Sequence, residues 1–292
     1  MVGSNPPLTL GLYAAFYLTS RPESEPRLVA AHEAYVTRYG QHLCMFLEDD
    51  TGKPRPFGKA ERDYPRRRLA KSGTSSVFWH ATGNTDPKFA SSWTVTGEVE
   101  RPDVEHGPDT LSGMWFSLHP DTAPAEFLEH AFTTVSLLDP YHGQAGYGVI
   151  EPPDIVATQM AWPGIAAVAH RFAGVEVNGF STTSVWAMDG IKSVNWLTIL
   201  SEELVERVGG RKSLRRKLST DIVFHELPKT LVLQAGPAPK MGDVNGVDEL
   251  QLYREVAQTL KPIFSKTVNS ALLYPDLGEW RDRLFKGAKW PP

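Results

Sequence analysis

The chain has 292 residues, of which 41% are hydrophobic, 10% aromatic and 22% charged, a composition typical of folded globular proteins. This composition excludes a disordered chain, and the length is sufficient to bury a core without disulfides or structural metals. A formal net charge of -4 is too small to indicate binding to nucleic acid or to an acidic membrane through overall charge.

The first half of the chain predicts strands and helices in mixed order. Apolar residues at helical spacing predict helices over 27–39, which a left-handed Gly40 would end, and over 124–138, while 59–71 fits a short charged helix. Apolar runs and period-two alternation predict strands over 8–18, 93–99, 114–118 and 143–150. The run 8–18 is shorter than a membrane span and has no Lys or Arg before it, so it does not indicate a secretion signal.

The second half continues the same mixture. Pro152-Pro153 opens a predicted helix that reaches about Phe172 and is kinked or split around Pro163. A strongly amphipathic helix is expected from Val247 to Leu260, capped by Asp243 or Asn245. Further strands are expected over 184–188, 193–200, 222–226 and 230–235, and further helices over 202–208, 212–218 and 279–285.

This irregular interleaving favours an α+β fold with a largely antiparallel sheet packed against helices over a doubly wound α/β fold. The sequence contains no disordered linker long enough to separate independent domains. We therefore expect a single compact unit, one domain over 1–292. Two intimate halves, about 1–150 and 151–292, are the alternative.

Motifs that carry chemistry are incomplete in this sequence. Gly209-Gly210-Arg211-Lys212-Ser213 places an arginine where a phosphate loop needs glycine and follows a helix, so a helix stop explains it better. The glycines of 143–148 lack the dinucleotide-binding spacing, and Ser181 lacks the small residue that a nucleophile elbow needs two positions later. These segments predict structure and not catalysis.

Cys44 and the histidines give no metal or redox signal. Cys44 lies in an apolar run, which predicts an inert core cysteine. The nine histidines never lie three or four residues apart, so zinc on one helix face is not expected, and we predict no metal and no cofactor. A single cysteine cannot form an intramolecular disulfide, which together with the missing secretion signal predicts a cytoplasmic protein.

Two basic runs, 66–71 and 211–217, are typical of solvated surface helices, so neither nucleic acid nor a membrane is expected as a partner. Two alternatives stay open. An α+β enzyme would assemble scattered His, Asp and Glu in a deep cleft, whereas a nucleic-acid-binding regulator would place both basic runs on one face. The absence of a catalytic motif favours a protein that binds another protein.

Several segments in order along the second half resemble a family of type VI secretion immunity proteins. The matching segments include Gly190-Ile-Lys-Ser-Val-Asn195-Trp196, Val208-Gly209-Gly210, Leu233-Gln-Ala-Gly236-Pro237, Gly242-Asp243-Val244-Asn245 and Leu260-Lys261-Pro262, with Gly146-Tyr147-Gly148 upstream. The family was formerly classed as a domain of unknown function and is paired with antibacterial toxins, nucleases among them. We expect the matching residues to be scaffold, with Asn195 and Trp196 on a buried strand.

The resemblance implies that the partner is a cognate secreted effector toxin and that neutralisation is stoichiometric, by occlusion, and not catalytic. The resemblance carries over no contact residues and no oligomeric state. Because a nuclease binds nucleic acid through a positive cleft, acidic residues are the expected toxin-binding candidates. The candidates are Glu48, Asp49, Asp50, Glu98, Glu100, Asp103 and Glu105.

Overall fold

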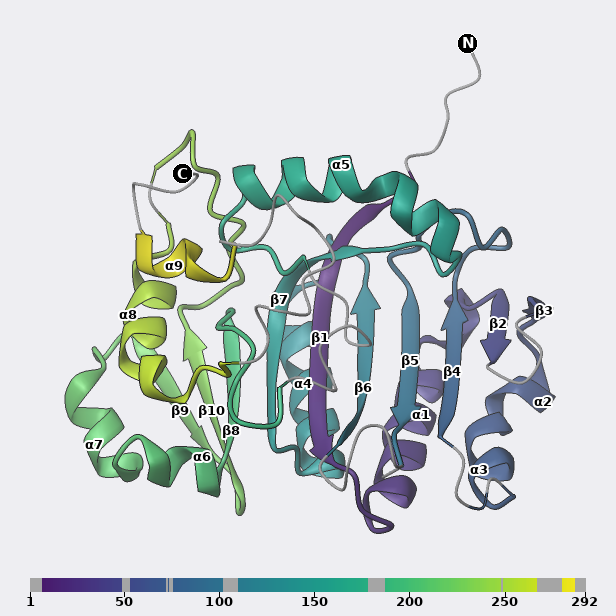
Figure 1. Ribbon diagram of the computed structural model, residues 1–292, viewed down its shortest axis with the longest axis horizontal. Coiled ribbons are helices and arrows are strands. Elements are labelled where there is room, and N and C mark those ends of the chain that lie inside the picture. Colours follow the sequence, from purple (N-terminus) through teal and green to yellow (C-terminus); the bar gives the residue numbers. More distant parts are fainter. Residues whose placement is uncertain are drawn as a thin grey trace.

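The computed structural model shows one sheet running across the width of the molecule, with helices packed around it (Figure 1). The structure describes residues 7–48, 53–71, 73, 76–101, 110–177, 187–247, 249–266 and 280–286. Within these ranges the sheet has ten strands in the order β3-β2-β4-β5-β6-β1-β7-β8-β10-β9, and each neighbouring pair is antiparallel. The α+β class, the antiparallel sheet and the single compact unit expected from the sequence are confirmed.

The strands are β1 (Thr9–Thr19), β2 (Met45–Glu48), β3 (Arg55–Pro56), β4 (Val77–Thr82), β5 (Thr94–Val99), β6 (Leu111–Leu118), β7 (His142–Ile150), β8 (Leu197–Ser201), β9 (Ile222–Glu226) and β10 (Thr230–Ala235). The helices are α1 (Ser24–Tyr39), α2 (Lys59–Arg62), α3 (Tyr64–Leu69), α4 (Pro124–Leu138), α5 (Ile155–Arg171), α6 (Glu202–Arg207), α7 (Gly210–Lys217), α8 (Gln251–Leu260) and α9 (Arg283–Lys286). Short 3-10 turns lie at η1 (Gly40–His42), η2 (Lys261–Ile263) and η5 (Trp280–Asp282).

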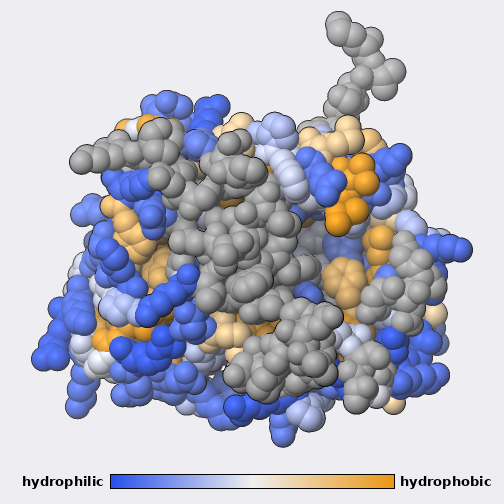
Figure 2. Space-filling model, viewed as in Figure 1, coloured by the Kyte–Doolittle hydropathy of each residue, from blue (hydrophilic) through white to orange (hydrophobic). Residues whose placement is uncertain are grey.

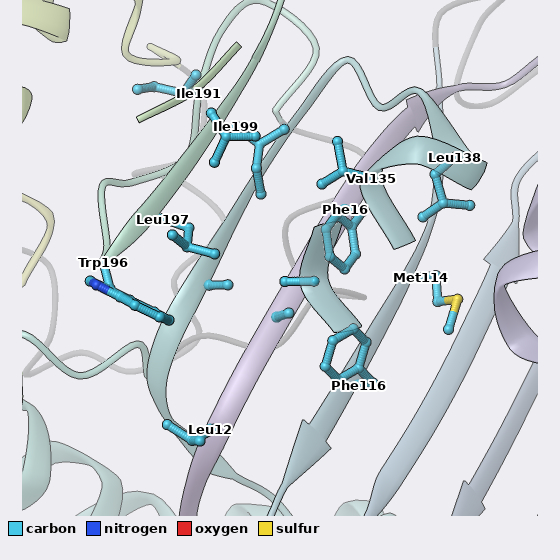
Figure 3. Close-up of a cluster of buried hydrophobic side chains, with 14 of the residues drawn as sticks. Leu12, Phe16, Met114, Phe116, Val135, Leu138, Ile191, Trp196, Leu197 and Ile199 are labelled. Carbon is cyan, nitrogen blue, oxygen red and sulfur yellow. The ribbon is translucent and has the colours of Figure 1, made fainter. Parts of the chain in front are cut away.

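The main core lies between the middle of the sheet and the helix pair α1 and α4. Alternate residues of β1 point to this side, and Phe116 of β6 pairs with Ala14 in register. The Phe116 ring lies 5.6 Å from Tyr35 of α1 and 6.2 Å from Phe127 of α4. Figure 3 shows Leu12, Phe16 and Phe116 in one layer with Val135 and Leu138 of α4.

The opposite side of β1 carries a smaller apolar cluster around Tyr13, Ala15 and Tyr17. Helices α6, α7 and α8 lie at the β9 end of the sheet, and α5 crosses the end of the central strands (Figure 1). None of the described helices combines the length and the hydropathy that crossing a bilayer requires.

Several local predictions are wrong, and one falls mostly outside the described residues. Gly40 has a right-handed φ of -61° and begins a 3-10 turn, so it is not a left-handed stop. The charged helix of 59–71 is two short helices separated at Asp63. Asn195 and Trp196 are buried but precede the strand, which begins at Leu197. The strand expected over 184–188 lies outside the described residues apart from Ala187 and Met188, which are not in a strand.

The amphipathic helix α8 begins at Gln251 and has no side-chain cap, so Asp243 and Asn245 do not cap it. The Asp243 carboxylate accepts hydrogen bonds from the backbone N–H of Asn245 at 3.0 Å and from the Arg171 guanidinium at 3.0 Å and 3.2 Å. These bonds turn the chain before the helix, and Val247 is 85% exposed as a result.

Candidate functional site

The resemblance residues converge where β7, β8 and the end of β10 meet. We call Gly146, Tyr147, Asn195, Trp196 and Gly236 the sheet junction. The side-chain oxygen Oδ1 of Asn195 accepts a hydrogen bond from the Trp196 backbone N–H at 2.8 Å, and the side-chain nitrogen Nδ2 of Asn195 donates to the Tyr147 backbone carbonyl at 3.3 Å. A Cβ on Gly146 would lie 2.0 Å from Asn195 Oδ1, so only glycine leaves room for this amide.

Trp196 is the largest side chain of the sheet junction and is fully buried. Its indole N–H donates to the Gly236 carbonyl at 2.8 Å, and its ring stacks on Phe127 of α4 with centroids 6.0 Å apart. Gly236 has a φ of +90°, a left-handed conformation that ends β10 without the strain a side chain would add. The sheet junction therefore joins three distant parts of the chain. This arrangement fits the scaffold role, which stays a prediction.

The remaining resemblance residues also hold segments together. A Cβ on Gly190 would lie 2.1 Å from the Ile263 carbonyl oxygen, and the next residue, Ile191, donates its N–H to that carbonyl at 2.8 Å. Asp243 forms the turn described above, whereas Pro237 and Asn245 are exposed. Helix α6 ends at Arg207, and Gly209 and Gly210, with φ of +96° and +81°, lie directly before α7 and at its first residue, which confirms the helix stop.

The structure describes three of the seven acidic candidates. Glu48 ends β2, is 6% exposed and forms an ion pair of 3.1 Å with Arg55. Glu98 of β5 is half-buried, and Glu100, also half-buried, accepts a hydrogen bond of 3.0 Å from Ser76. Asp49, Asp50, Asp103 and Glu105 lie outside the described residues. The toxin-binding role of these seven acids stays a prediction.

Glu100 borders a pocket of about 260 Å³ between β5, β6 and the start of α1. Its lining includes Ser20, Glu25, Arg101 and Ser112. Arg101 and Glu25 form an ion pair of 2.7 Å within it, so the charges of this pocket are already matched. Its described lining contains no histidine, and it is therefore not the His-containing cleft that the enzyme alternative requires.

Three buried histidines have lowered pKa values. Burial lowers the pKa of His32 to about 4, of His80 to about 4 and of His142 to about 3. These histidines are neutral at physiological pH. His32 accepts a hydrogen bond of 3.1 Å from the Trp79 indole, and His142 stacks on Tyr17 at 4.3 Å.

A buried ion pair between Glu176 and Lys192 was not predicted from the sequence. The Lys192 ammonium lies 2.7 Å from Glu176 Oε1, and the two side chains are 1% and 2% exposed. Burial lowers the pKa of Lys192, and the Glu176 carboxylate opposes that shift. Arg283 lies close by, donating to the Ala173 carbonyl at 2.7 Å and to Ser193 Oγ at 3.2 Å. An isolated glutamate between Val175 and Val177 is the one signal that the sequence offered.

The two basic runs lie at opposite ends of the sheet, since α3 packs near β4 and α7 lies by β9 (Figure 1). Arg66 binds the Glu33 carboxylate through its Nε and Nη2 nitrogens, with hydrogen bonds of 2.7–3.0 Å. Arg211 pairs with Glu202, and Arg215 pairs with Glu226 at 2.7 Å and covers the Phe224 ring. The regulator alternative required both runs on one face; their separation, and the pairing of Arg66, Arg211 and Arg215 with acids, do not favour it.

The cysteine prediction is wrong. Cys44 is exposed, because it precedes β2 and its neighbours Leu43 and Met45 take the buried positions. Ser181 lies outside the described residues. Within the described ranges, no three His, Cys, Asp or Glu side chains are placed to hold a metal ion.

The comparisons with known proteins decide what this scaffold is. A family model described as "TsiV: Type VI immunity for VRR-NUC" matches residues 27–289. The chain belongs to the TsiV family. Among curated proteins nothing matches the sequence.

A solved structure described as "Pseudomonas aeruginosa T6SS protein PA0821" shares the TsiV chain's fold with a TM-score of 0.82 and 22% sequence identity. The match covers 95% of this chain and 82% of that one. The family makes this chain a type VI immunity protein against a VRR-NUC nuclease toxin and not an enzyme. The sequence predicted the immunity function and a nuclease as the toxin, and the family adds the VRR-NUC class. The family also implies that the chain binds such a toxin.

Proposed function

We propose that this TsiV-family chain neutralises its toxin by forming a tight stoichiometric complex in the cytoplasm, in which its surface occludes the nuclease. The family match over residues 27–289 carries this proposal. The geometry supports binding over turnover, because the buried His32 and His142 contact other core side chains. The buried Glu176 and Lys192 are likewise paired with each other.

The toxin-binding surface is proposed to be formed by one domain over 1–292. The boundary between the alternative halves falls inside the sheet, because β7 pairs with β8 from Gln144↔Thr198 to His142↔Leu200. A sheet that crosses this boundary supports a rigid, preformed surface, which lowers the entropy cost of binding.

Within that surface, we propose that the acidic candidates contact the toxin cleft and repel nucleic acid from it. Glu100 lines the pocket at β5 and β6, and Glu98 lies two residues before it on β5. Acidic groups facing a positive cleft accelerate association and repel the competing phosphates. Asp103 and Glu105 follow in sequence, and we propose that they extend the same acidic surface.

A titration of nuclease activity tests the mechanism. Purified toxin at a fixed concentration far above the dissociation constant cleaves a labelled nucleic acid while the immunity protein is added in steps. We expect activity to fall linearly and to end at one immunity chain per toxin. An Asp121→Asn variant, which changes an exposed acid outside the candidates, serves as the matched control and should give the same end point.

Complete loss of toxin activity at ratios far below one, increasing with time, would indicate catalytic inactivation and overturn the stoichiometric mechanism. Residual activity that persists above a ratio of one, with a complex still formed, would overturn occlusion while leaving binding intact.

A further inference from the structure

Helix α5 is apolar on every side although it lies on the surface. Its inward residues are buried and small or aliphatic: Ala157, Ala161, Ile165 and Ala169. Its outward residues include Ile155, Val156 and Met160, which are 73%, 58% and 77% exposed. From Ile155 to His170 the sequence contains no Asp, Glu, Lys or Arg. A helix that is hydrophobic all round is ordinarily buried, so the outer face of α5 is expected to be covered.

This outer face is a continuous patch. Figure 2 shows an orange area over the part of α5 nearest its N-terminus, where Ile155, Val156 and Met160 lie. The patch continues along the helix through exposed Pro163, Gly164 and Ala167, and Gln159 is the polar residue among them. Three of the six large exposed apolar side chains of the described chain gather here.

We infer that a second copy of this chain covers the α5 face, with the two α5 helices packed antiparallel about a two-fold axis near Pro163 and Gly164. This inference goes beyond the proposed immunity function and does not depend on it. Two copies each carry a net charge of -4, and contact through an uncharged helix places no like charges opposite each other. The positive cleft of a nuclease would instead be matched by acids, which α5 lacks.

The order of side-chain sizes along α5 fits such a pair. The exposed apolar residues of its first half are large, whereas the exposed apolar residues of its second half are small. An antiparallel pair centred between positions 163 and 164 sets Met160 of one copy against Ala167 of the other, so a large side chain meets a small one. Val156 faces Arg171, which is exposed at the end of the helix.

The ends of α5 are also complementary under this symmetry. Asp154 caps the N-terminus, accepting the Ala157 N–H at 2.8 Å, and Arg171 is the last residue of the helix. In the antiparallel pair Asp154 of one copy lies within a turn of Arg171 of the other, and the helix dipoles oppose each other favourably. A helix of 17 residues is about 25 Å long, so the contact is smaller than a standard interface of roughly 800 Å² per partner. We therefore expect a reversible dimer.

Sedimentation velocity of the toxin-free chain between 1 and 100 µM tests the inference. The expected result is a concentration-dependent shift from the 32.4 kDa monomer toward a dimer. Met160→Glu should weaken the dimer at least tenfold, because it places a carboxylate in the uncharged contact. Val223→Glu, on the exposed side of β9, makes the same kind of exchange at a residue 46% exposed and should leave the dimer unchanged. Unchanged circular dichroism confirms that both variants fold.

Cross-linking with a short bis-maleimide tests the geometry, in a Cys44→Ser background because the native thiol is exposed. Pro163→Cys should cross-link efficiently, since the two copies meet there. Ile155→Cys should not, because the two positions lie about 25 Å apart in an antiparallel pair.

A wild type that stays monomeric at 100 µM, or a Met160→Glu variant that dimerises like the wild type, overturns the inference. Stronger cross-linking at position 155 than at 163 overturns the antiparallel arrangement. If the wild type is monomeric and Met160→Glu abolishes toxin capture, the occupant of this face is the toxin. Because the dimer is measured without toxin, its failure leaves the immunity function untouched.

Discussion

The sheet junction and the residues Glu98 and Glu100 at the end of β5, which we call the acidic edge, use polar side chains in opposite ways. At the sheet junction the polar atoms of Asn195 and Trp196 are buried and bonded to backbone groups of β7 and β10. At the acidic edge Glu98 and Glu100 are half-buried, and Glu100 lines a pocket. We expect the first region to maintain the fold, and we propose that the second contacts one particular toxin.

Among the changes that test this comparison, replacement of Trp196 should reduce the unfolding free energy most. Trp196→Ala removes a buried ring and leaves a cavity beside Phe127, and we expect a loss of about 3–5 kcal/mol of unfolding free energy in urea. Trp196→Phe keeps ring packing and removes one donor from the Gly236 carbonyl, which still accepts from Gln234 at 2.9 Å. That variant should lose about 1 kcal/mol. A cost below about 1 kcal/mol for Trp196→Ala would contradict the scaffold role.

A smaller effect is expected at Gly146, where a methyl group would collide with Asn195 Oδ1. Gly146→Ala should cost about 1–3 kcal/mol, measured by urea denaturation. In an Asn195→Ala background the same change should cost at least ~1 kcal/mol less, because the colliding atom is gone. Gly246→Ala is the matched control, since its Cβ would meet ordinary contacts at 3.5 Å. Equal costs in both backgrounds would show that the clash is relieved elsewhere.

The smallest effect on stability, and the one specific to the toxin, is expected at the acidic edge. Glu98→Gln with Glu100→Gln should leave unfolding nearly unchanged and slow toxin association several-fold at low salt. The difference should shrink as salt rises, because exposed charges are screened. Association rates by biolayer interferometry, with Asp121→Asn as control, provide the measurement. Wild-type association rates in the double variant would remove these two acids from the toxin-binding surface.

Helices and strands whose buried residues follow the regular helical or strand spacing were predictable from the sequence. Residues 124–138 form a helix with the expected bounds, because Phe127, Ala131 and Val135 make a continuous stripe that packs on the sheet. Val247 continued such a stripe toward α8, yet it is exposed because the bonds between Arg171 and Asp243 turn the chain first. Helical spacing alone cannot reveal an ion pair formed with a residue 72 positions away.

The candidate site was less predictable than the fold. Matching segments located the sheet junction, but the bonds that Asn195 makes depend on β7 lying beside it. Glu176 and Lys192 are separated by 15 residues that include a segment outside the described ranges, and neither has a motif. Their pairing arises from tertiary structure, so no local pattern could have predicted it.

The position of β1 has a consequence for how protection is acquired during synthesis. The two neighbours of this strand are β6 and β7, which are made only after residues 20–110 and 20–141. Such non-local pairing makes folding slow relative to helical proteins. A nascent chain that stops before β7 leaves the centre of the sheet unpaired on one side. We therefore expect finished chains, and not chains still being made, to protect a cell under attack.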